Sequence, residues 1–345
     1  MLPFVQLTQF YACLFRCGSL NKVYTCSNFN TPLINACYYD DPDTVDEILK
    51  LGANINAQGR AENTALCMAA ICNNPNVCKF LIEAGADVTL CNHDGENILF
   101  LAAAQGLTEI CLLLINEEKL DKNCKNTTWR SRESGANALM YAAHGPATGV
   151  NCSSQPDTCR ALIAAGVELN EQDDLGQTPL LYAVGSSRPN TEETARLLIE
   201  AGANVNIETK FGTNALWRAA YSGLKDTCKL IIEQGGDAPI TGEYTNNHCN
   251  SAVQEAGKPF VHGGRGGISK PYTALMVAAS EVAAIKEPEQ WDWNAQQWLD
   301  LIKVLVEAGS DINAATEMGT AWSLARDWDN KEVMKFLEEL GATPQ

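Results

Sequence analysis

Residues Gly176–Asn206 read GQTPLLYAVGSSRPNTEETARLLIEAGANVN and predict two short helices joined by a turn. Thr178 is suited to cap the first helix through its hydroxyl, and Pro179 takes the first helical position, where no N–H is needed. A second helix is predicted to start at Asn190, with Glu three residues later as in a capping box. Gly202 is expected to end it, because a left-handed residue is least strained without a Cβ. Helices this short need neighbours of the same kind to bury their apolar faces.

The rest of the chain supplies those neighbours, because the same pattern recurs along it. Each copy has a Thr or Asn at the capping position and an Ala five residues later, and most copies have a Gly after the second helix. Successive capping positions are 33, 33, 40, 41, 36, 59 and 47 residues apart, so the base period is 33 with insertions. The capping positions are Thr31, Thr64, Asn97, Asn137, Thr178, Asn214, Thr273 and Thr320.

The motif at the start of each copy stands as TPLINA after Asn30, TALCMA after Asn63 and TPLLYA after Gln177. With its 33-residue period, the chain resembles the ankyrin repeat family, whose unit is a β-turn and two helices opening with T-P-L-H-x-A. No copy keeps the His of that motif, and Pro survives twice. The resemblance implies an all-α solenoid of stacked helix-turn-helix units with β-turn finger loops. Its domain covers residues 29–345, with repeats beginning near residues 29, 62, 95, 135, 176, 212, 271 and 318.

The charge of the chain bears on its partners. It carries 42 acidic and 25 basic residues, a formal net charge of −17. This balance opposes general binding of DNA, RNA or anionic membranes. It favours a protein partner with a basic or mixed surface.

The fourteen cysteines raise the question of disulfides or metal binding. Four of them, Cys78, Cys111, Cys159 and Cys228, occupy one and the same position in the second helix. Buried free cysteine suits such a small apolar core position. Equivalent residues of neighbouring repeats lie roughly 10 Å apart, the usual distance between packed helices, which is too far for a disulfide. The pattern therefore predicts a reducing, cytoplasmic compartment.

The first 28 residues are apolar but lack the basic start of a signal peptide, and Gln6, Gln9 and Arg16 interrupt the apolar run. The segment is too short and polar for a membrane span. We interpret residues 1–28 as a capping segment over the first repeat. An anchor on a membrane surface is the alternative, and the near absence of positive charge disfavours it.

Residues 236–271 form the longest insertion, and a loop of this length is usually functional or disordered. Its glycine-rich part lacks the G-K-[ST] ending of a phosphate-binding loop. His248, Cys249 and His262 are candidates for a metal site or a thiol–imidazole pair, but four ligands at structural spacing are missing. A recognition hairpin or a plain loop is the preferred interpretation.

The next repeat carries extra residues between its helices, and its apolar period extends upstream from Leu301 to Trp298. Both helices of this repeat are therefore predicted to be longer than in the other copies. Trp291 and Trp293 are expected to pack on the extension. The alternative is that they are exposed anchors for a partner.

The resemblance implies that a concave face made of turns and first helices binds other proteins. In the middle repeats, this face is predicted to carry an aromatic and polar strip, of a kind that anchors interfaces. The alternative is that these long side chains pack on one another across repeats. The predicted partner-binding residues are Tyr141, His144, Tyr182, Phe211, Arg218 and Tyr221.

These observations predict a non-enzymatic intracellular scaffold or adaptor that binds a partner protein as a monomer. The sequence suggests no cofactor, no metal and no small-molecule substrate. One alternative rests on analogy: arrays with irregular insertions are similar to those that intracellular bacteria and large viruses deliver into the host cytosol to capture host proteins. The other alternative is an enzyme or metal site in the insertion at residues 236–271.

Overall fold

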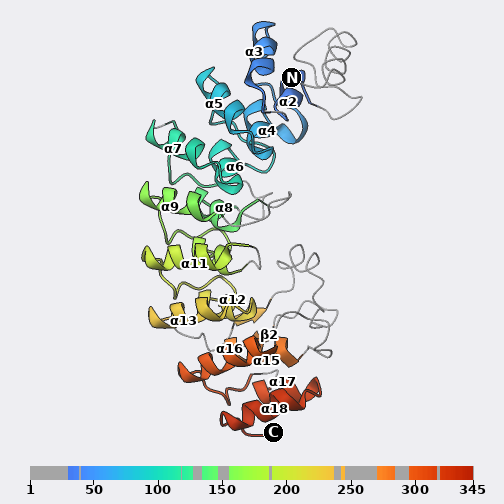
Figure 1. Ribbon diagram of the computed structural model, residues 1–345, viewed down its shortest axis with the longest axis vertical. Coiled ribbons are helices and arrows are strands. Elements are labelled where there is room, and N and C mark those ends of the chain that lie inside the picture. The colour runs from blue at the N-terminus through green and yellow to red at the C-terminus, as the bar shows by residue number, and fades with distance from the viewer. Residues whose placement is uncertain are drawn as a thin grey trace. The chain divides into compact units, whose positions relative to one another are not determined.

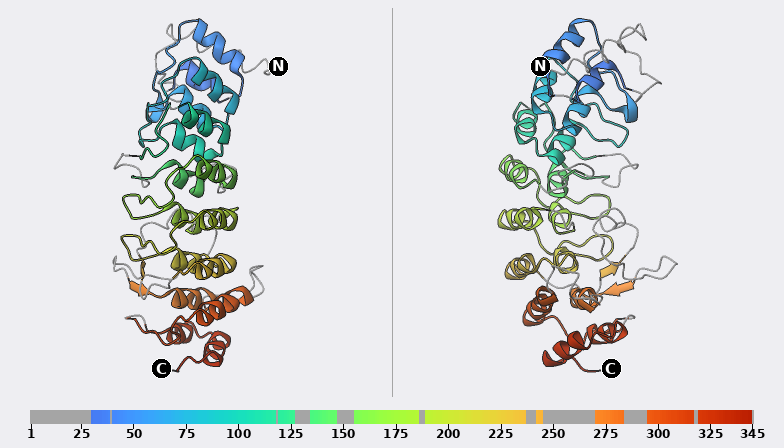
Figure 2. Two further views of the ribbon diagram at one scale, coloured as in Figure 1. Left: turned by 90° about the vertical axis from the view of Figure 1, so that its left-hand side faces the viewer. Right: turned by 45° about the vertical axis from the view of Figure 1, so that its right-hand side comes forward.

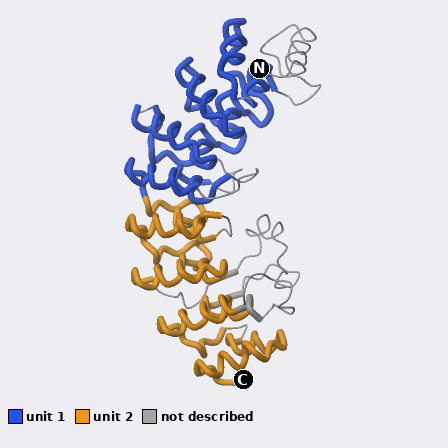
Figure 3. Tube along the Cα trace, viewed as in Figure 1, with its two compact units in different colours: residues 1–168 blue, residues 169–345 orange. Residues whose placement is uncertain are grey.

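The computed structural model describes residues 30–38, 40–117, 119–126, 134–146, 155–185, 189–236, 242–244, 270–283, 295–316 and 319–344. The chain divides into two compact units, residues 1–168 and 169–345, drawn in blue and orange in Figure 3. Both units consist of consecutive helix pairs, as the repeat pattern predicts. The predicted capping segment at residues 1–28 lies outside the described residues.

The described residues of the first unit form four helix pairs, and each pair has a short first helix and a longer second helix (Figure 1). A turn of 3-10 helix, Arg60–Glu62, precedes the second pair. The first helices are α2 (Pro32–Ala36), α4 (Ala65–Ile71), α6 (Ile98–Gln105) and α8 (Ala138–His144). The second helices are α3 (Pro42–Lys50), α5 (Pro75–Glu83), α7 (Thr108–Asn116) and α9 (Pro156–Ala164).

The second unit also contains four pairs (Figure 1). Its third pair has helices of 10 and 13 residues, against 7 and 9 in the pair before it, which confirms the predicted lengthening. Trp291 and Trp293 lie outside the described residues. The first helices are α10 (Pro179–Val184), α12 (Ala215–Tyr221), α15 (Ala274–Ala283) and α17 (Ala321–Asp327). The second helices are α11 (Thr191–Glu200), α13 (Lys225–Glu233), α16 (Ala295–Glu307) and α18 (Lys331–Glu339).

Within each unit, first helices pack on first helices and second helices on second helices, as both views of Figure 2 show, except that the last second helix, α18, packs on α17 and α15. α6 shows the consequence for the sequence, since it lies between α4 and α8 and every residue from Ile98 to Ala104 is buried. Phe100 is 1% exposed, and such a burial stabilises the fold by about 1.5–3 kcal/mol. α3 and α18 instead bury only one stripe each, and their other faces are polar.

All eight predicted capping residues cap the first helices. Each side-chain oxygen accepts a hydrogen bond from a backbone N–H in the first turn, as in Thr178, which accepts from Leu181 N at 3.3 Å. A cap of this kind is worth about 1 kcal/mol. The capping box predicted at Asn190 is wrong. Asn190 precedes α11 with a left-handed φ of 64°, and its side chain makes no capping bond.

The glycines predicted to follow the second helices all have the expected left-handed backbone. Gly202 has a φ of 94°, and the other six range from 75° to 103°. The cysteine position in the second helices is also as predicted, because Cys78, Cys111, Cys159 and Cys228 are free and fully buried. The core therefore uses these thiols as small apolar groups.

The insertion after α13 begins and ends in a short antiparallel strand pair, visible in Figure 2. β1 (Gly242–Tyr244) pairs with β2 (Lys270–Tyr272), with Glu243 opposite Pro271. The pair brings the two ends of the insertion together next to the start of α15. Residues 245–269, which include His248, Cys249 and His262, lie outside the described residues.

Candidate functional site

Two positions of the first-helix segment recur from repeat to repeat and form two rows of side chains. Five of the six predicted partner-binding residues stand in these rows. We call them the plus-four row and the plus-seven row, after their distance from the capping residue. The plus-four row includes Met68, Leu101, Tyr141, Tyr182 and Arg218. The plus-seven row consists of Tyr38, Ile71, Ala104 and His144 in the first unit, and Gly185, Tyr221, Ser280 and Asp327 in the second.

The plus-four row is largely buried. Met68, Leu101 and Tyr182 are each 7% exposed, and Tyr141 is 4% exposed. Side chains this deep contribute to packing between neighbouring repeats. The two tyrosines of the predicted strip therefore lie in the core, with their hydroxyls turned to partners within their own unit.

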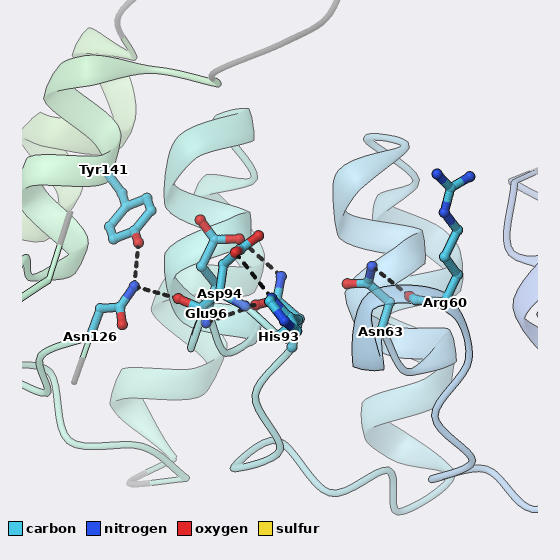
Figure 4. A network of polar contacts seen from close by, with 8 residues as sticks. Arg60, Asn63, His93, Asp94, Glu96, Asn126 and Tyr141 are labelled. Atoms are coloured by element: carbon cyan, nitrogen blue, oxygen red, sulfur yellow. Dashed lines mark hydrogen bonds and ion pairs between the residues drawn. The ribbon is translucent and has the colours of Figure 1, made fainter. Parts of the chain in front are cut away.

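Tyr141 connects α8 to two finger turns of the first unit, the loops before α6 and α8 that contain Asp94 and Asn126 (Figure 4). Its ring stacks on Phe100, with 5.1 Å between ring centroids, and its hydroxyl lies 2.8 Å from Asn126 Nδ2. Asn126 also donates to the carbonyl oxygen of Asp94 at 3.0 Å. The tyrosine thus joins two successive fingers, which gives it a structural role.

The half-buried carboxyl group of Glu96 belongs to the same network. Asn92 Oδ1 accepts from the backbone of Asp94 and Glu96, and Asn92 Nδ2 donates to Glu96 Oε2 at 3.0 Å. Burial raises the pKa of Glu96, and the hydrogen bonds from Asn92 and Tyr141 oppose that rise. Burial is the larger effect, so the charged form of Glu96 is disfavoured relative to water.

The second unit has the same turn with amide and carboxylate exchanged. Asp173 stands where the first unit has Asn92, and Gln177 stands where it has Glu96. Gln177 Nε2 donates to Asp173 Oδ2 at 3.3 Å, and the Tyr182 hydroxyl donates to the same oxygen at 2.8 Å. Each of the two turns therefore pairs one amide side chain with one carboxylate. In each turn a tyrosine hydroxyl also bonds to the carboxylate.

The remaining predicted residues are half-buried. Arg218 Nη1 donates to Gln177 Oε1 at 2.7 Å, and it lies 3.4 Å from the Leu181 carbonyl oxygen. The Tyr221 ring stacks on Trp217, with 5.8 Å between centroids. Phe211 lies in the finger before α12, and its N–H donates to Thr209 Oγ1. In the second unit, half-buried Phe211, Arg218 and Tyr221 thus come from two neighbouring segments, the finger and α12.

His144, the last residue of α8, is half-buried in the first unit. Tyr141 and His144 belong to the first unit, and the other four predicted residues belong to the second.

The structure adds two residues that the prediction did not include. Tyr38 is 48% exposed and Ile71 is 38% exposed, and both stand in the plus-seven row. Leu51, at the end of α3, is the third exposed large apolar residue in the described part of the chain. The repeat register is the signal that points to Tyr38 and Ile71, because they stand seven residues after a capping residue, as His144 and Tyr221 do.

Negative charge is concentrated on the second helices and the turns. The first helices α2, α4, α6, α8, α10 and α12 contain no Asp or Glu. α11 and α13 contribute Glu192, Glu193 and Asp226 to a depression on their surface. These six first helices are therefore free of carboxylates, whereas α15 contains Glu281 and α17 contains Asp327.

Among the described residues, no group of three or more His, Cys, Asp or Glu side chains is arranged to hold a metal ion. Burial raises the pKa of the Cys111 and Cys159 thiols to about 12, so both are protonated at neutral pH. A protonated, buried thiol is a poor nucleophile and a poor metal ligand. No helix in the described part of the chain is long and apolar enough to cross a membrane.

Comparison with protein families gives three matching segments, residues 7–92, 66–151 and 149–241, all to the family described as ankyrin repeats. The putative ankyrin repeat protein YahD of Escherichia coli strain K12 is 27% identical over 210 residues, which cover 60% of this chain and 98% of that protein. An ankyrin repeat domain from Acinetobacter baumannii AYE has 32% identity and a TM-score of 0.48, covering 60% of this chain and 98% of that one.

Longer proteins match over part of their length. The nuclear factor NF-kappa-B p105 subunit of Gallus gallus is 31% identical over 187 residues, 54% of this chain. The E3 ubiquitin-protein ligase KEG of Arabidopsis thaliana is 25% identical over 274 residues, 69% of this chain. The matched segments span 18% of the p105 subunit and 17% of KEG, so they concern the repeat region of this chain and only a part of each relative.

Proposed function

We propose that this chain, which belongs to the ankyrin repeat family, is a non-enzymatic intracellular scaffold that binds a partner protein through its first helices and finger turns. One observation carries the proposal. In the plus-seven row, the large side chains of Tyr38 and Ile71 are exposed to solvent, and His144 and Tyr221 are half-buried, at a repeat position that is held by the small residues Ala104 and Gly185 in two other repeats. Aromatic and aliphatic groups exposed in a row are more useful to an interface than to a monomer.

The roles within the predicted strip differ. We assign contact with the partner to His144 in the first unit and to Phe211, Arg218 and Tyr221 in the second, because part of each side chain remains accessible. Tyr141 and Tyr182 support the face from below by fixing the finger turns through their hydroxyls. Rigid support of this kind lowers the entropy lost on binding.

Electrostatics favours a partner with a basic or mixed surface. The formal net charge is −17, and six of the eight described first helices contain no carboxylate, so most of the negative charge lies on the second helices and turns. Charge of this sign steers an oppositely charged partner and accelerates association, while the apolar groups supply affinity. The free, buried cysteines are compatible with a reducing compartment.

The proposal is tested by affinity capture from an extract with quantitative mass spectrometry. The test variant is Arg218→Ala with Tyr221→Ala, which leaves the buried tyrosines intact. The matched control is Arg196→Ala, an exposed arginine on the second helix α11. A partner that is captured by the wild type and by the Arg196→Ala control but not by the double variant would support the assignment, provided that the thermal melt of the double variant is unchanged. Retention of every partner by the folded double variant would refute it for the second unit.

A further inference from the structure

Two exposed apolar side chains lie on neighbouring helices of the first unit. Tyr38 follows α2 and Ile71 ends α4, and these two helices pack against each other. Both residues hold the plus-seven position, so the packing of the repeats places them in one row. The Tyr38 ring is almost half exposed, which is unusual for an aromatic side chain of a close-packed repeat.

The chain beside Tyr38 is strongly acidic. Between residues 40 and 50 there are five carboxylates and one ammonium group, and that group, Lys50, is paired with Asp46 on the same helix. The other four carboxylates therefore give the start of α3 a negative charge. The carboxylates belong to Asp40, Asp41, Asp43, Asp46 and Glu47.

Asp40 is exposed and yet fixed in position. Its Oδ1 accepts from the backbone N–H of Val77 at 3.2 Å, and its Oδ2 accepts from Asn76 Nδ2 at 2.7 Å. Both donors are neutral groups, and each carboxylate oxygen keeps a lone pair for a further donor. A carboxylate held in one place two residues after an exposed tyrosine is suited to receive a cation that follows an apolar anchor.

We infer that Tyr38, Ile71 and the carboxylates at the start of α3 form a docking surface for a short partner segment in which an apolar side chain is flanked by lysine or arginine. The apolar side chain contacts Tyr38 and Ile71, and the cations meet Asp40 and its neighbours. This assignment rests on the proposed function, since it names the chemistry of a partner for the first-helix face. It is specific to the first two repeats, because in the described residues no other first helix combines an exposed large apolar residue with so acidic a turn.

The test is selection of a random peptide library, displayed on phage, against the full-length chain. Selected peptides are then measured one by one by fluorescence anisotropy. We expect enriched peptides to contain an aromatic or aliphatic residue next to Lys or Arg. We expect their affinity to fall by about tenfold or more in Tyr38→Ser with Ile71→Ser, the loss typical of removing interface anchors.

Charge and position are separated by two further variants. Asp40→Asn with Asp43→Asn removes two charges while leaving an amide oxygen that can accept from Val77 N–H, and we expect binding to weaken by about fivefold at low salt and less at high salt. Leu51→Ser is the matched control, because Leu51 is 61% exposed in the same repeat but outside the plus-seven row. It should leave binding unchanged.

Several outcomes would overturn the inference. They are enrichment of acidic or uncharged peptides, retained affinity in the Tyr38 and Ile71 variant, or an equal loss in the Leu51 variant. If the selected peptides lose affinity only in Arg218→Ala with Tyr221→Ala, this surface is wrong and the proposed function survives. If no peptide and no extract protein binds the folded chain, both fail.

A second measurement tests whether another segment of the chain, or a second copy, covers the surface. A photo-crosslinking amino acid placed at position 38 reports what covers the surface in the free protein. Crosslinks to a bound library peptide would support the inference. Crosslinks to residues 1–29 of the same chain, or to a second copy, would show that the surface is already occupied and would overturn it.

Discussion

Gly185 lies directly beneath the guanidinium group of Arg218. A Cβ added at Gly185 would stand 2.8 Å from Arg218 Nη1 and 2.9 Å from the backbone carbonyl oxygen of Leu181, both closer than real Cβ contacts allow. Gly185 itself has a right-handed backbone, with φ −80° and ψ −4°, so its glycine is not required by conformation. The glycine instead leaves room for Arg218 to reach across from α12 to Gln177 before α10.

Gly185→Ala is therefore expected to displace Arg218 and to destabilise the chain. Overpacking of this kind costs about 1–3 kcal/mol. Urea unfolding of Gly185→Ala, Arg218→Ala and the double variant measures the coupling between the two positions. The alanine should cost less when Arg218 is already absent. Equal costs in both backgrounds would show that the arginine is not what the Cβ meets.

The local signals were readable from the sequence. A Thr or Asn cap and a Gly after the second helix act within a few residues of where they stand, so their chemistry does not depend on the rest of the fold. Thr178 and Gly202 behave as predicted for that reason. Asn190 differs because its own backbone is left-handed, with φ 64°, whereas Thr178 has the extended backbone of an N-cap, and the Asn190 side chain makes no capping bond.

The candidate site was less predictable because burial depends on neighbouring repeats. Tyr182 stands at a position that faces partners in the family, but its hydroxyl bonds to Asp173 in the preceding turn and the ring lies in the core. Tyr38 shows the converse, since Ala104 and Ser280 of the same row are buried and Tyr38 is 48% exposed. A repeat pattern fixes which row a residue occupies, and the side chains around it decide how deep it lies.

The finger turn at Glu62 provides a stability test. Four other fingers place a left-handed glycine two residues before the capping residue, at Gly95, Gly135, Gly176 and Gly212. The second repeat has Glu62 there, with φ 59°, preceded by Ala61 with φ 54°. A left-handed conformation costs an L-residue about 1–2 kcal/mol. Glu62→Gly should therefore stabilise the chain by about 1 kcal/mol, less the backbone entropy that glycine loses on folding.

Gly95→Ala in the next finger is the reciprocal control and should destabilise by a similar amount. Thermal and urea unfolding of the two variants give the comparison. If Glu62→Gly is neutral or destabilising while Gly95→Ala behaves as expected, the strain at Glu62 is relieved by contacts of its side chain. Contacts of the Glu62 side chain would then stabilise the turn in addition to its backbone hydrogen bonds.

Glu96 predicts how stability depends on pH. Burial raises its pKa in the folded chain above the ordinary value of 4.5. A group with a raised folded pKa contributes stability below its unfolded pKa and loses it as the pH rises through the folded pKa. At about pH 7 the ionised Glu96 therefore destabilises the folded chain, so Glu96→Gln should raise the free energy of unfolding. Gln177 at the equivalent position shows that the turn accommodates glutamine.

The advantage of Glu96→Gln should shrink as the pH falls below both pKa values, because the wild-type carboxyl is then neutral as well. Urea unfolding at about pH 7 and about pH 3.5 measures both limits. Gln177→Glu made together with Arg218→Ala serves as the opposite change and should destabilise at neutral pH relative to Arg218→Ala alone, since it sets a second carboxylate beside Asp173 without the guanidinium that donates to residue 177 in the wild type. A pH-independent gain from Glu96→Gln would contradict the assignment to charge burial.

The cysteines of the first unit should separate sharply in their reactivity. Cys91 is exposed in a finger turn, whereas Cys111 and Cys159 are fully buried in α7 and α9 with pKa values raised to about 12. Alkylation by iodoacetamide requires an accessible thiolate, so native protein should react at Cys91 first and leave the two helical thiols unmodified. Mass spectrometry of tryptic peptides after timed alkylation reads each site. Concentrated guanidinium chloride should make all three react, and labelling of Cys111 or Cys159 at the native Cys91 rate would mean that these helices open on the time scale of the reaction.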